Sequence, residues 1–361
     1  MDWRARYERV AARYAAGERR ELDERQLVQL ANAAWAAGLS LLMAGHRAGA
    51  VKWLRRAAGR YRESWDVGAA TEAWGRPIGA MKALLIAGQD ATDAARWALA
   101  AGAPQADSPI GRYAGVLALL VLSRDEEATE LAQTLSADFP EDVAAALVAL
   151  GRSDVSAYEE AVARVRRSFE ERDAFLEDLP VADTALALDA LAVRRAAEAQ
   201  LAGLADVVAR LESEAIDYWL FGGWAVDFHV GRLTRVHTDV DLAVPLDELP
   251  PVRSLLERDG WRHAPEPEED GGTGFERGTV RLELTYLVRL DDGAIATPFR
   301  AGPAAWDADA LADEVRELLG VRCRVVSRAA LLRGKSTPRE EPDEAARDRA
   351  DYEVLRTALE E

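Results

Sequence analysis

The sequence changes its pattern once, near Asp217, and this change constrains the fold more than any other feature. From Glu21 to about Gln200, apolar residues recur at the spacing of amphipathic helices, and almost nothing resembles a strand. After Asp217 the pattern becomes short β-rich runs, punctuated by Gly and Pro and interleaved with helical stretches. A chain of 361 residues is also long for one compact unit. We therefore expect a two-domain protein, with an all-α domain over residues 1–200 and an α+β domain over residues 201–361.

The first domain is expected to be an array of helical hairpins. Turns centred on Gly45 and Gly88 separate helical stretches over residues 27–44, 48–61, 78–87 and 92–101. Longer helices are expected over residues 158–179 and 182–213, and the second of these leads into the next domain. The segment from Trp35 to Tyr61 loosely resembles a tetratricopeptide-type repeat. Such an array serves either as a groove for a partner peptide or as a packing scaffold, and the pattern leaves both open.

The composition argues against several classes of partner. The formal net charge is -18, and the basic residues are almost all Arg, with Lys only at positions 52, 82 and 335. Nucleic acids and anionic membranes attract clustered Lys and Arg, so neither is expected, whereas a cationic partner is. No apolar stretch reaches membrane-spanning length, and the N-terminus lacks the apolar core of a secretory signal, which indicates a cytoplasmic protein. The single cysteine, Cys323, is expected to be a small buried residue.

The second domain is expected to mix strands with helices. Strands are predicted over residues 218–221, 239–244, 274–277, 280–288 and 321–326. Helices are predicted over residues 225–230, 251–259, 308–318 and 328–332.

Two glycines and two aspartates in this domain carry the chemistry. Gly222 and Gly223 lie between a strand and a helix, where missing side chains let backbone N–H groups approach a phosphate at the positive helix end. Asp239 and Asp241 lie two residues apart in a strand, so their carboxylates share one face while the next apolar residues point into the core. Mg²⁺ prefers such carboxylates together with triphosphate oxygens and water. The arrangement predicts a site for a metal-bound nucleoside triphosphate.

A third carboxylate, Glu283, lies in a strand of alternating character. Leu282 and Leu284 would pack inward, while Glu283 shares its face with Arg281 and Thr285. In that position Glu283 would bind a second metal ion or deprotonate an attacking hydroxyl. Paired aspartates also occur as solubilising residues on edge strands, but the glycines upstream and Glu283 downstream favour a metal site.

The combined pattern, GG-W-x-x-D-x-x-x-G-x-x-T-R-x-H-x-D-h-D-h with h an apolar residue, resembles antibiotic nucleotidyltransferases of the polymerase-β superfamily. It resembles in particular the aminoglycoside 2''-adenylyltransferase and lincosamide nucleotidyltransferase groups, which share the two-glycine form. The similarity covers residues 215–357. It implies a polymerase-β-like fold and transfer of a nucleoside monophosphate, from ATP or another triphosphate, to a hydroxyl with release of pyrophosphate.

The resemblance also implies roles for single residues. Asp239 and Asp241 would hold two Mg²⁺ ions, and Glu283 would be a metal ligand and the base. Gly222 and Gly223 would line the triphosphate.

Three basic residues extend this set. Arg235 and His237, just before the metal strand, would steady either the phosphates or the loop itself. His237 could equally be a structural histidine, as could His229. Lys335 would contact the triphosphate, or else is an ordinary surface lysine. In the same pattern, Trp224 is expected in the core, and Asp227 is expected to hydrogen-bond the adjacent loop, so neither belongs to this set.

The acceptor is less constrained, because fold and metal site fix the donor chemistry and leave the acceptor to loops. An acidic run of Glu266, Glu268, Glu269 and Asp270 is either a solvated loop or an attractor for a cationic acceptor. Phe299 and Trp306 would stack on an acceptor or pack in the core.

Three functions stay open at this point. The first is an enzyme acting on a small molecule such as an aminoglycoside-like antibiotic. The second is an enzyme whose helical domain binds a protein that it adenylylates, as an antitoxin or regulator would. The third is a binding module with a vestigial site. The intact Asp239, Asp241 and Glu283 argue against the third, and the Gly-Gly form argues against the Gly-Ser antitoxin pattern.

Overall fold

The computed structural model describes residues 1–18, 21–68, 72–135, 139–172, 174–265, 270–339 and 341–358. It divides into two compact units, Met1–Ala192 and Val193–Glu361, and the division falls inside helix α10 (Asp183–Ser213). Each unit has its own hydrophobic core. Leu191 is the last buried residue of the first core and Ala197 is the first of the second.

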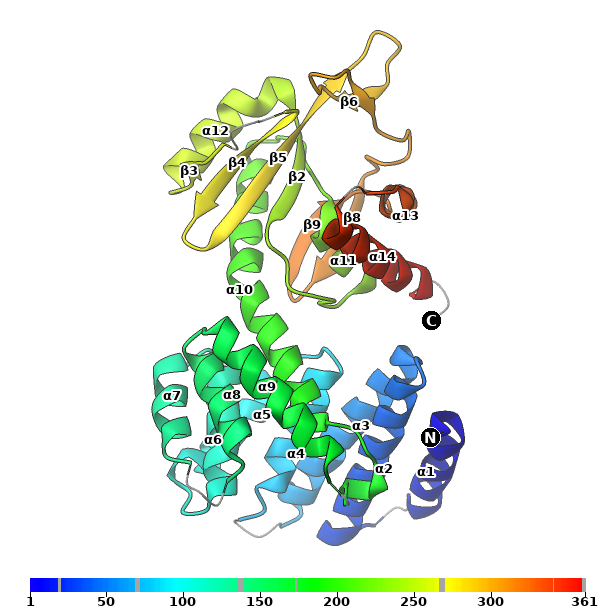
Figure 1. Cartoon of the computed structure of the whole chain (residues 1–361), viewed down its shortest axis with the longest axis vertical. Helices are drawn as coiled ribbons and strands as arrows, with labels where there is room; N and C mark the ends of the chain where they lie inside the picture. The colour runs from blue at the N-terminus through cyan, green and yellow to red at the C-terminus, as the bar shows by residue number, and fades with distance from the viewer. Residues whose placement is uncertain are drawn as a thin grey trace. The chain divides into compact units, whose positions relative to one another are not determined.

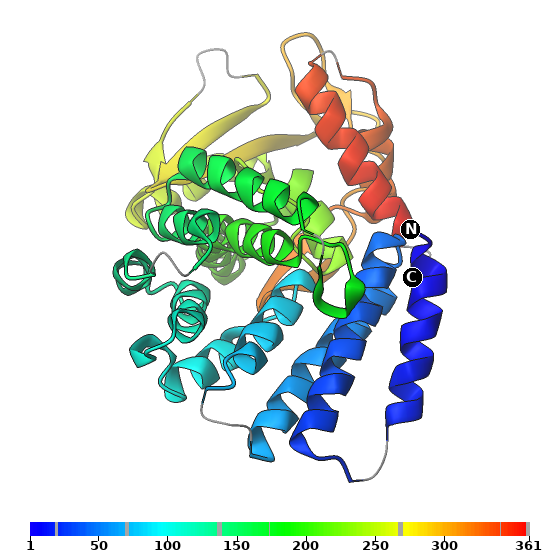
Figure 2. The same cartoon turned by 60° about the horizontal axis from the view of Figure 1, so that its bottom comes forward.

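The described residues of the first unit form helices and turns without strands, which confirms the all-α prediction. Consecutive helices pack against one another, and Figure 2 shows α1, α2 and α3 side by side. The tetratricopeptide-type likeness stays a prediction. In chain order the helices are α1 (Trp3–Gly17), α2 (Glu24–Met43), α3 (Arg47–Asp66), α4 (Gly75–Ile86), α5 (Thr92–Ala100), the 3-10 helix η1 (Ala103–Gln105), α6 (Pro109–Val121), α7 (Asp125–Gln133), α8 (Glu141–Gly151), α9 (Val155–Glu170), the 3-10 helix η2 (Leu176–Asp178) and the first part of α10.

The hairpin of α2 and α3 shows why this sequence folds as an array. A side chain at Gly38 would lie 2.7 Å from Cγ of Leu54, so the glycine allows the two helices to approach closely. The predicted turns are present, because Gly45 and Gly88 follow α2 and α4 with φ of 80° and 68°, a conformation that glycine adopts without strain.

The helix expected over residues 158–179 is wrong in its second half. Helix α9 ends at Glu170, and the chain then makes the short turn η2 with Glu177 at a φ of 58°. Leu179 is buried in the core of the first unit, and Arg13 binds the Glu177 carboxylate. These long-range contacts hold the segment out of helical conformation, although its charge pattern suits a helix.

The second unit is built on a mixed sheet, which confirms the α+β prediction (Figure 1). The strand order is β3-β4-β5-β2-β1-β9-β8, with β6 pairing β5 and β7. The pairs β2/β5 and β1/β9 are parallel and the other pairs are antiparallel. The strands are β1 (Trp219–Leu220), β2 (Val240–Pro245), β3 (Arg262–His263), β4 (Gly272–Arg277), β5 (Val280–Arg289), β6 (Ile295–Thr297), β7 (Ala304–Ala305), β8 (Glu314–Leu318) and β9 (Val321–Val325).

Helices cover the sheet and frame one end of it. In Figure 1 the second part of α10 lies behind β2, β4 and β5, and Gly203 on this helix approaches Val280 and Trp261. At the other end α11, α13 and α14 pack together. The helices of this unit are α11 (Gly222–Val230), the 3-10 helix η3 (Leu246–Glu248), α12 (Leu249–Arg258), α13 (Arg328–Ser336) and α14 (Pro342–Thr357).

The helix expected over residues 308–318 is also wrong, because its second half is strand β8. Leu319 and Gly320 both adopt positive φ, at 49° and 85°, and connect β8 to β9 as a two-residue hairpin turn. Leu318 pairs with Val321 beside this turn and is buried. Pairing with the buried strand β9 therefore overrides the helical propensity of the Ala- and Leu-rich segment.

Two smaller expectations concern single features. Cys323 is fully buried in β9, as predicted. None of the helices in the described part of the chain combines the length and apolarity needed to cross a bilayer.

Candidate active site

The two predicted metal ligands lie at the start of β2, a central strand of the sheet. Asp241 is the second residue of β2, and Asp239 directly precedes the strand. Val240 and Leu242 are buried in the core of the second unit. Since neighbouring side chains of a strand point to opposite faces, burial of these two apolar residues directs both carboxylates to the other face.

Glu283 lies beside Asp241 on the adjacent strand. Strands β2 and β5 are parallel, and their register places Asp241 directly opposite Glu283. The neighbours of Glu283, Leu282 and Leu284, are buried, whereas its own side chain is 41% exposed. Arg281 Nε donates a 2.9 Å hydrogen bond to its carboxylate. The sheet therefore brings the third predicted carboxylate to the same face as Asp241.

Gly222 provides the space that the Asp241 carboxylate occupies. Gly222 is the first residue of α11 and has a φ of 65°; a Cβ atom there would lie 2.0 Å from Asp241 Oδ2. The preceding residue, Phe221, makes no side-chain capping bond to the helix. The positive end of α11 and strand β2 therefore meet at one point, as an anion-binding strand-to-helix turn requires.

The electrostatics of this point favour a bound cation. The pKa of Asp241 is raised to about 8, chiefly by burial and then by the negative charges of Asp239 and Glu283, while the cations Lys335 and Arg235 oppose the rise. The structure thus gathers the predicted carboxylates and two predicted basic residues around Asp241.

The carboxylates fit Mg²⁺ as partial ligands. Their oxygens are the hard donors that Mg²⁺ selects, and their mutual repulsion would be relieved by a divalent ion. Across the described residues, no three His, Cys, Asp or Glu side chains are grouped to hold a metal alone. The remaining coordination would come from phosphate oxygens and water, which is the usual way Mg²⁺ is bound.

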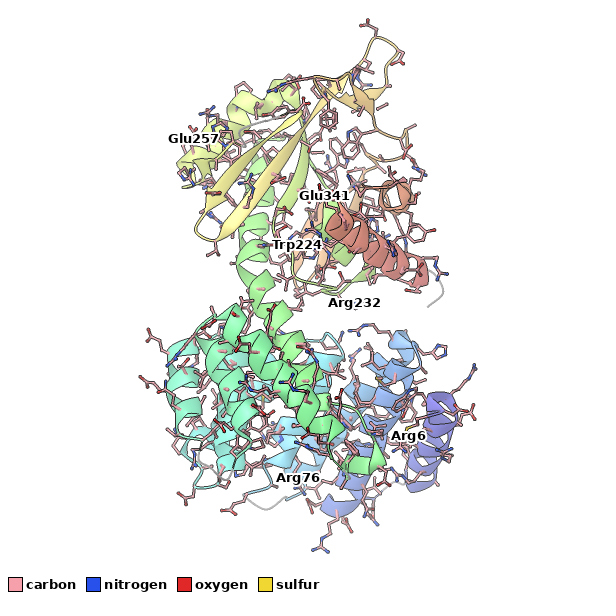
Figure 3. All side chains as sticks on the ribbon, viewed as in Figure 1. Arg6, Arg76, Trp224, Arg232, Glu257 and Glu341 are labelled. Carbon is pink, nitrogen blue, oxygen red and sulfur yellow. The ribbon has the colours of Figure 1, made fainter. Side chains whose placement is uncertain are left out.

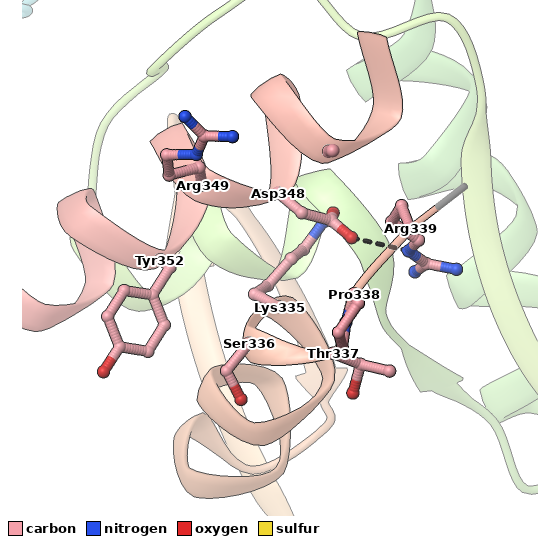
Figure 4. Close-up of a pocket in the computed structure, with 9 residues that line it drawn as sticks. Lys335, Ser336, Thr337, Pro338, Arg339, Asp348, Arg349 and Tyr352 are labelled. Carbon is pink, nitrogen blue, oxygen red and sulfur yellow. Dashed lines mark hydrogen bonds and ion pairs between the residues drawn. The ribbon is translucent and has the colours of Figure 1, made fainter. Parts of the chain in front are cut away.

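Arg235 and Lys335 are held beside the site by helix α14. Arg235 Nε lies 3.1 Å from Asp351 Oδ1, and Lys335 Nζ lies 2.9 Å from Asp351 Oδ2. Lys335 Nζ also lies 2.7 Å from Asp348 Oδ1. Asp351 is almost fully buried and pairs with both cations, so it holds them in place. Figure 4 shows Lys335 beside the second aspartate, Asp348. Lys335 is therefore not an ordinary surface lysine.

His237 is part of a buried network that holds the loop before β2. Its Nε2 lies 2.7 Å from Asp227 Oδ2, and its ring lies 4.5 Å from that of Trp224. Trp224, labelled in Figure 3, is almost completely buried, and its Nε1 donates to Gln200 Oε1 at 2.8 Å. Gln200 in turn donates to the His237 carbonyl at 2.8 Å. Of the two roles expected for His237, its surroundings match the support of the loop.

Asp227 and Gly223 complete this network. Asp227 accepts a 3.1 Å hydrogen bond from Thr234 N, so it bonds the adjacent loop as expected. A Cβ atom at Gly223 would lie 2.3 Å from Arg235 Nη2 and 2.6 Å from His237 Nδ1. The absence of a side chain at Gly223 therefore leaves the space that the Arg235 and His237 side chains of the adjacent loop occupy. His229 is also engaged structurally, with Nε2 2.8 Å from the Val326 carbonyl.

The residues predicted to contact the acceptor have different surroundings. Glu266, Glu268 and Glu269 lie outside the described residues, while Asp270 accepts a 2.7 Å hydrogen bond from Arg300 N. Phe299 is 40% exposed. Trp306 packs edge-on against Phe221 at 5.6 Å and donates to Thr297 Oγ1 at 2.9 Å. Trp306 is thus brought next to the start of α11.

Sequence reasoning missed three polar residues that hold the site together. Gln200, Asp348 and Asp351 contact the site from α10 and α14. Asp348 and Asp351 are three residues apart, about one helical turn, and this spacing is the local pattern that predicts both side chains on the same face of a helix. Arg235, a partner of Asp351, lies 116 residues before it in the chain, so no local pattern connects the two.

Comparisons with known proteins match this unit. Residues 203–347 match the profile of the family described as aminoglycoside-2''-adenylyltransferase. A 2''-aminoglycoside nucleotidyltransferase of Escherichia coli is 34% identical over 56 residues, which are 16% of this chain and 32% of that protein. One from Klebsiella pneumoniae matches equally. The matched segment therefore spans about a third of the length of these relatives.

Solved structures of two antibiotic-modifying enzymes also align with the chain. Lincomycin-bound lincosamide antibiotic adenylyltransferase LnuA is 21% identical, covers 45% of this chain and 97% of its own, and gives a TM-score of 0.37. ANT(2'')-Ia in complex with adenylyl-2''-tobramycin is 23% identical, covers 45% of this chain and 90% of its own, and gives a TM-score of 0.35. The glycine pair, both aspartates and Glu283 all lie inside the segment that matches the aminoglycoside-2''-adenylyltransferase profile, so the similarity to this family covers the candidate site.

Proposed function

We propose that the second unit is a Mg²⁺-dependent nucleotidyltransferase that transfers AMP from ATP to a hydroxyl of a small cationic molecule of the aminoglycoside type. One observation carries this proposal. Asp241 lies against the first residue of α11 and directly opposite Glu283, within a segment that matches the family profile. The triphosphate, the metal ions and the general base would therefore lie at one site.

The proposed reaction is an in-line displacement at the α-phosphorus. The acceptor oxygen forms a bond to this phosphorus, the bond from the α-phosphorus to the bridging oxygen breaks, and pyrophosphate leaves with that oxygen and its electron pair. Glu283 takes the proton of the acceptor hydroxyl. Its position on a strand face, with 41% of its side chain exposed, supports access to an acceptor from solvent.

Asp239 and Asp241 are the proposed ligands of two Mg²⁺ ions. When bound, these ions would neutralise charge on the triphosphate and on the leaving pyrophosphate. Lys335 and Arg235 would add positive charge on the same side, because both already act on the Asp241 carboxylate.

A cationic acceptor is supported by charge as well as by family. The chain carries a net charge of -18, which attracts polyamine-like molecules at long range and repels anionic ones. The matched relatives are named for aminoglycosides. Exposed Phe299 and Asp270, which accepts a hydrogen bond from Arg300 N, are the proposed acceptor-side surface.

The test is transfer of radiolabel from ATP in the presence of Mg²⁺, with aminoglycosides, lincosamides and cell lysate as separate acceptors. We expect the label on a small molecule, and its appearance on a lysate protein would instead support the adenylylation of a partner. Asp239→Asn and Asp241→Asn should abolish transfer, because each removes a proposed metal ligand. Asp247→Asn, an exposed aspartate just beyond the other end of β2, is the matched control. Equal transfer by all three variants would overturn the assignment.

A further inference from the structure

A cavity of about 300 Å³ lies between α13 and α14, next to the proposed donor site (Figure 4). Its walls carry three cations, Lys335, Arg339 and Arg349, against the single described carboxylate Asp348. Tyr352 and the hydroxyl-bearing residues Ser336 and Thr337 complete much of the lining. Asp348 and, behind Lys335, Asp351 balance part of this positive charge, so an anion that entered the cavity would compete with Asp348 for Lys335 and Arg339.

Asp348 occupies the centre of this cation cluster. Lys335 Nζ lies 2.7 Å from its Oδ1, and Arg339 Nε lies 2.7 Å from its Oδ2. Each carboxylate oxygen is therefore held by a different cation, as the oxygens of a phosphate group would be. The pKa of Asp348 is lowered by hydrogen bonds from these two cations, although burial opposes this, so the carboxylate is charged at neutral pH.

The second carboxylate of α14 has a different position. Asp351 is 2% exposed and holds Arg235 as well as Lys335, while the Asp348 side chain is 10% exposed and faces the cavity. Displacement of Asp348 would therefore leave Lys335 anchored by Asp351 and still beside Asp241. Arg339, with a side chain 49% exposed, has room to turn toward a ligand at the cavity mouth.

We propose that this cavity is a polyphosphate site for the pyrophosphate end of the donor, and that Asp348 occupies it as an internal competitor when the donor is absent. The carboxylate stands where a phosphate group would bind Lys335 and Arg339. The assignment of the ligand to the donor rests on the proposed function, whereas the anion site itself does not.

The direct test is calorimetric titration of inorganic pyrophosphate into the full-length protein in metal-free buffer. Asp348→Asn removes the competing charge but keeps the side-chain shape, so pyrophosphate should bind about fivefold more tightly, as expected for one partly exposed charge pair. Arg339→Gln removes a cation and should weaken binding by about the same factor. AMP, which lacks the pyrophosphate end, should respond to neither variant.

The matched control is Glu353→Gln, which makes the same change of charge on α14 but alters an exposed residue paired with Arg356. If this control tightens pyrophosphate binding as much as Asp348→Asn, the effect is one of overall charge and the site is refuted. Failure of wild-type protein to bind pyrophosphate, or unchanged binding by Arg339→Gln, would refute it as well.

The donor assignment is tested separately by the KM for ATP in the transfer assay. We expect KM to fall in Asp348→Asn and to rise in Arg339→Gln. If pyrophosphate affinity changes while the KM for ATP does not, the cavity binds free anions and the donor assignment is wrong. If wild-type protein transfers no nucleotide but the pyrophosphate affinities follow the expected order, the proposed function fails and the anion site stands.

Discussion

Replacement of Gly222 by alanine should disturb the proposed metal site more than it disturbs the fold. The new Cβ would lie 2.0 Å from Asp241 Oδ2, whereas Cβ atoms essentially never approach another heavy atom within 3.0 Å. The Asp241 carboxylate must therefore move by about 1 Å or more, because Gly222 is fixed at the start of α11. A displacement of about 1 Å in a reacting group typically lowers the rate about 10²-fold.

The same substitution also has a cost in stability. At a φ of 65°, a residue with a side chain is strained by about 1–2 kcal/mol relative to glycine. Gly231 provides a matched control at the other end of α11, because its φ is 71° and a Cβ added there would meet no atom within 4 Å. Gly231→Ala should therefore show the backbone strain alone.

Both variants would be compared by urea denaturation, by Mg²⁺ titration and by the transfer assay. We expect similar losses of stability, about 1–2 kcal/mol, but a loss of transfer of about 10²-fold and weaker Mg²⁺ binding in Gly222→Ala only. If Gly222→Ala retained the Mg²⁺ affinity and activity of Gly231→Ala, contact between Gly222 and the Asp241 carboxylate, a proposed metal ligand, would have no functional consequence and the reasoning would fail.

Three further predictions follow from the ionisable groups. The free energy of unfolding of the metal-free protein should fall as the pH rises from about 4 to about 8, by at most about 1.4 kcal/mol per pH unit. The reason is that the folded protein keeps a proton on Asp241 in this range, whereas the unfolded chain releases it. Chemical denaturation across this range should show the slope, and saturating Mg²⁺ should flatten it; a flat metal-free profile would contradict the raised pKa. His237→Ala should destabilise the second unit by about 2–3 kcal/mol in thermal unfolding, because it leaves the fully buried Asp227 without one partner, and a neutral effect would remove the loop-support role. Lys82→Ala should destabilise the first unit by about 3 kcal/mol, because it removes the ammonium that lies 2.6 Å from the Asp183 carboxylate and leaves that charge without its partner. The double variant Lys82→Ala, Asp183→Ala should recover part of the lost stability. No recovery would contradict the explanation by an unpaired charge.

Local patterns predicted the parts of the site that a single segment defines. The glycine pair at the start of a helix, the aspartates on either side of Val240 and the alternation around Glu283 are all visible within a few residues. The helical first unit was predictable for the same reason, since amphipathic spacing reports local structure directly.

Features that depend on distant contacts were not predictable. The register that places Asp241 opposite Glu283 is set by the pairing of two strands that are far apart in the sequence, and nothing local specifies it. Segment 314–318 has helix-forming residues but pairs with β9, and the segment around Glu177 is held by contacts with α1. In each case tertiary contacts outweighed local propensity.

The crowded surroundings of Gly223 have an evolutionary consequence. A serine here would place its Cβ 2.3 Å from Arg235 Nη2 and 2.6 Å from His237 Nδ1. A side chain at position 223 would therefore require Arg235 and His237 to move from the positions that Asp351 and Asp227 hold them in. Homologues with serine at this position should carry smaller or differently placed residues at positions 235 and 237, so that the two segments co-vary although 11 residues separate Gly223 from Arg235.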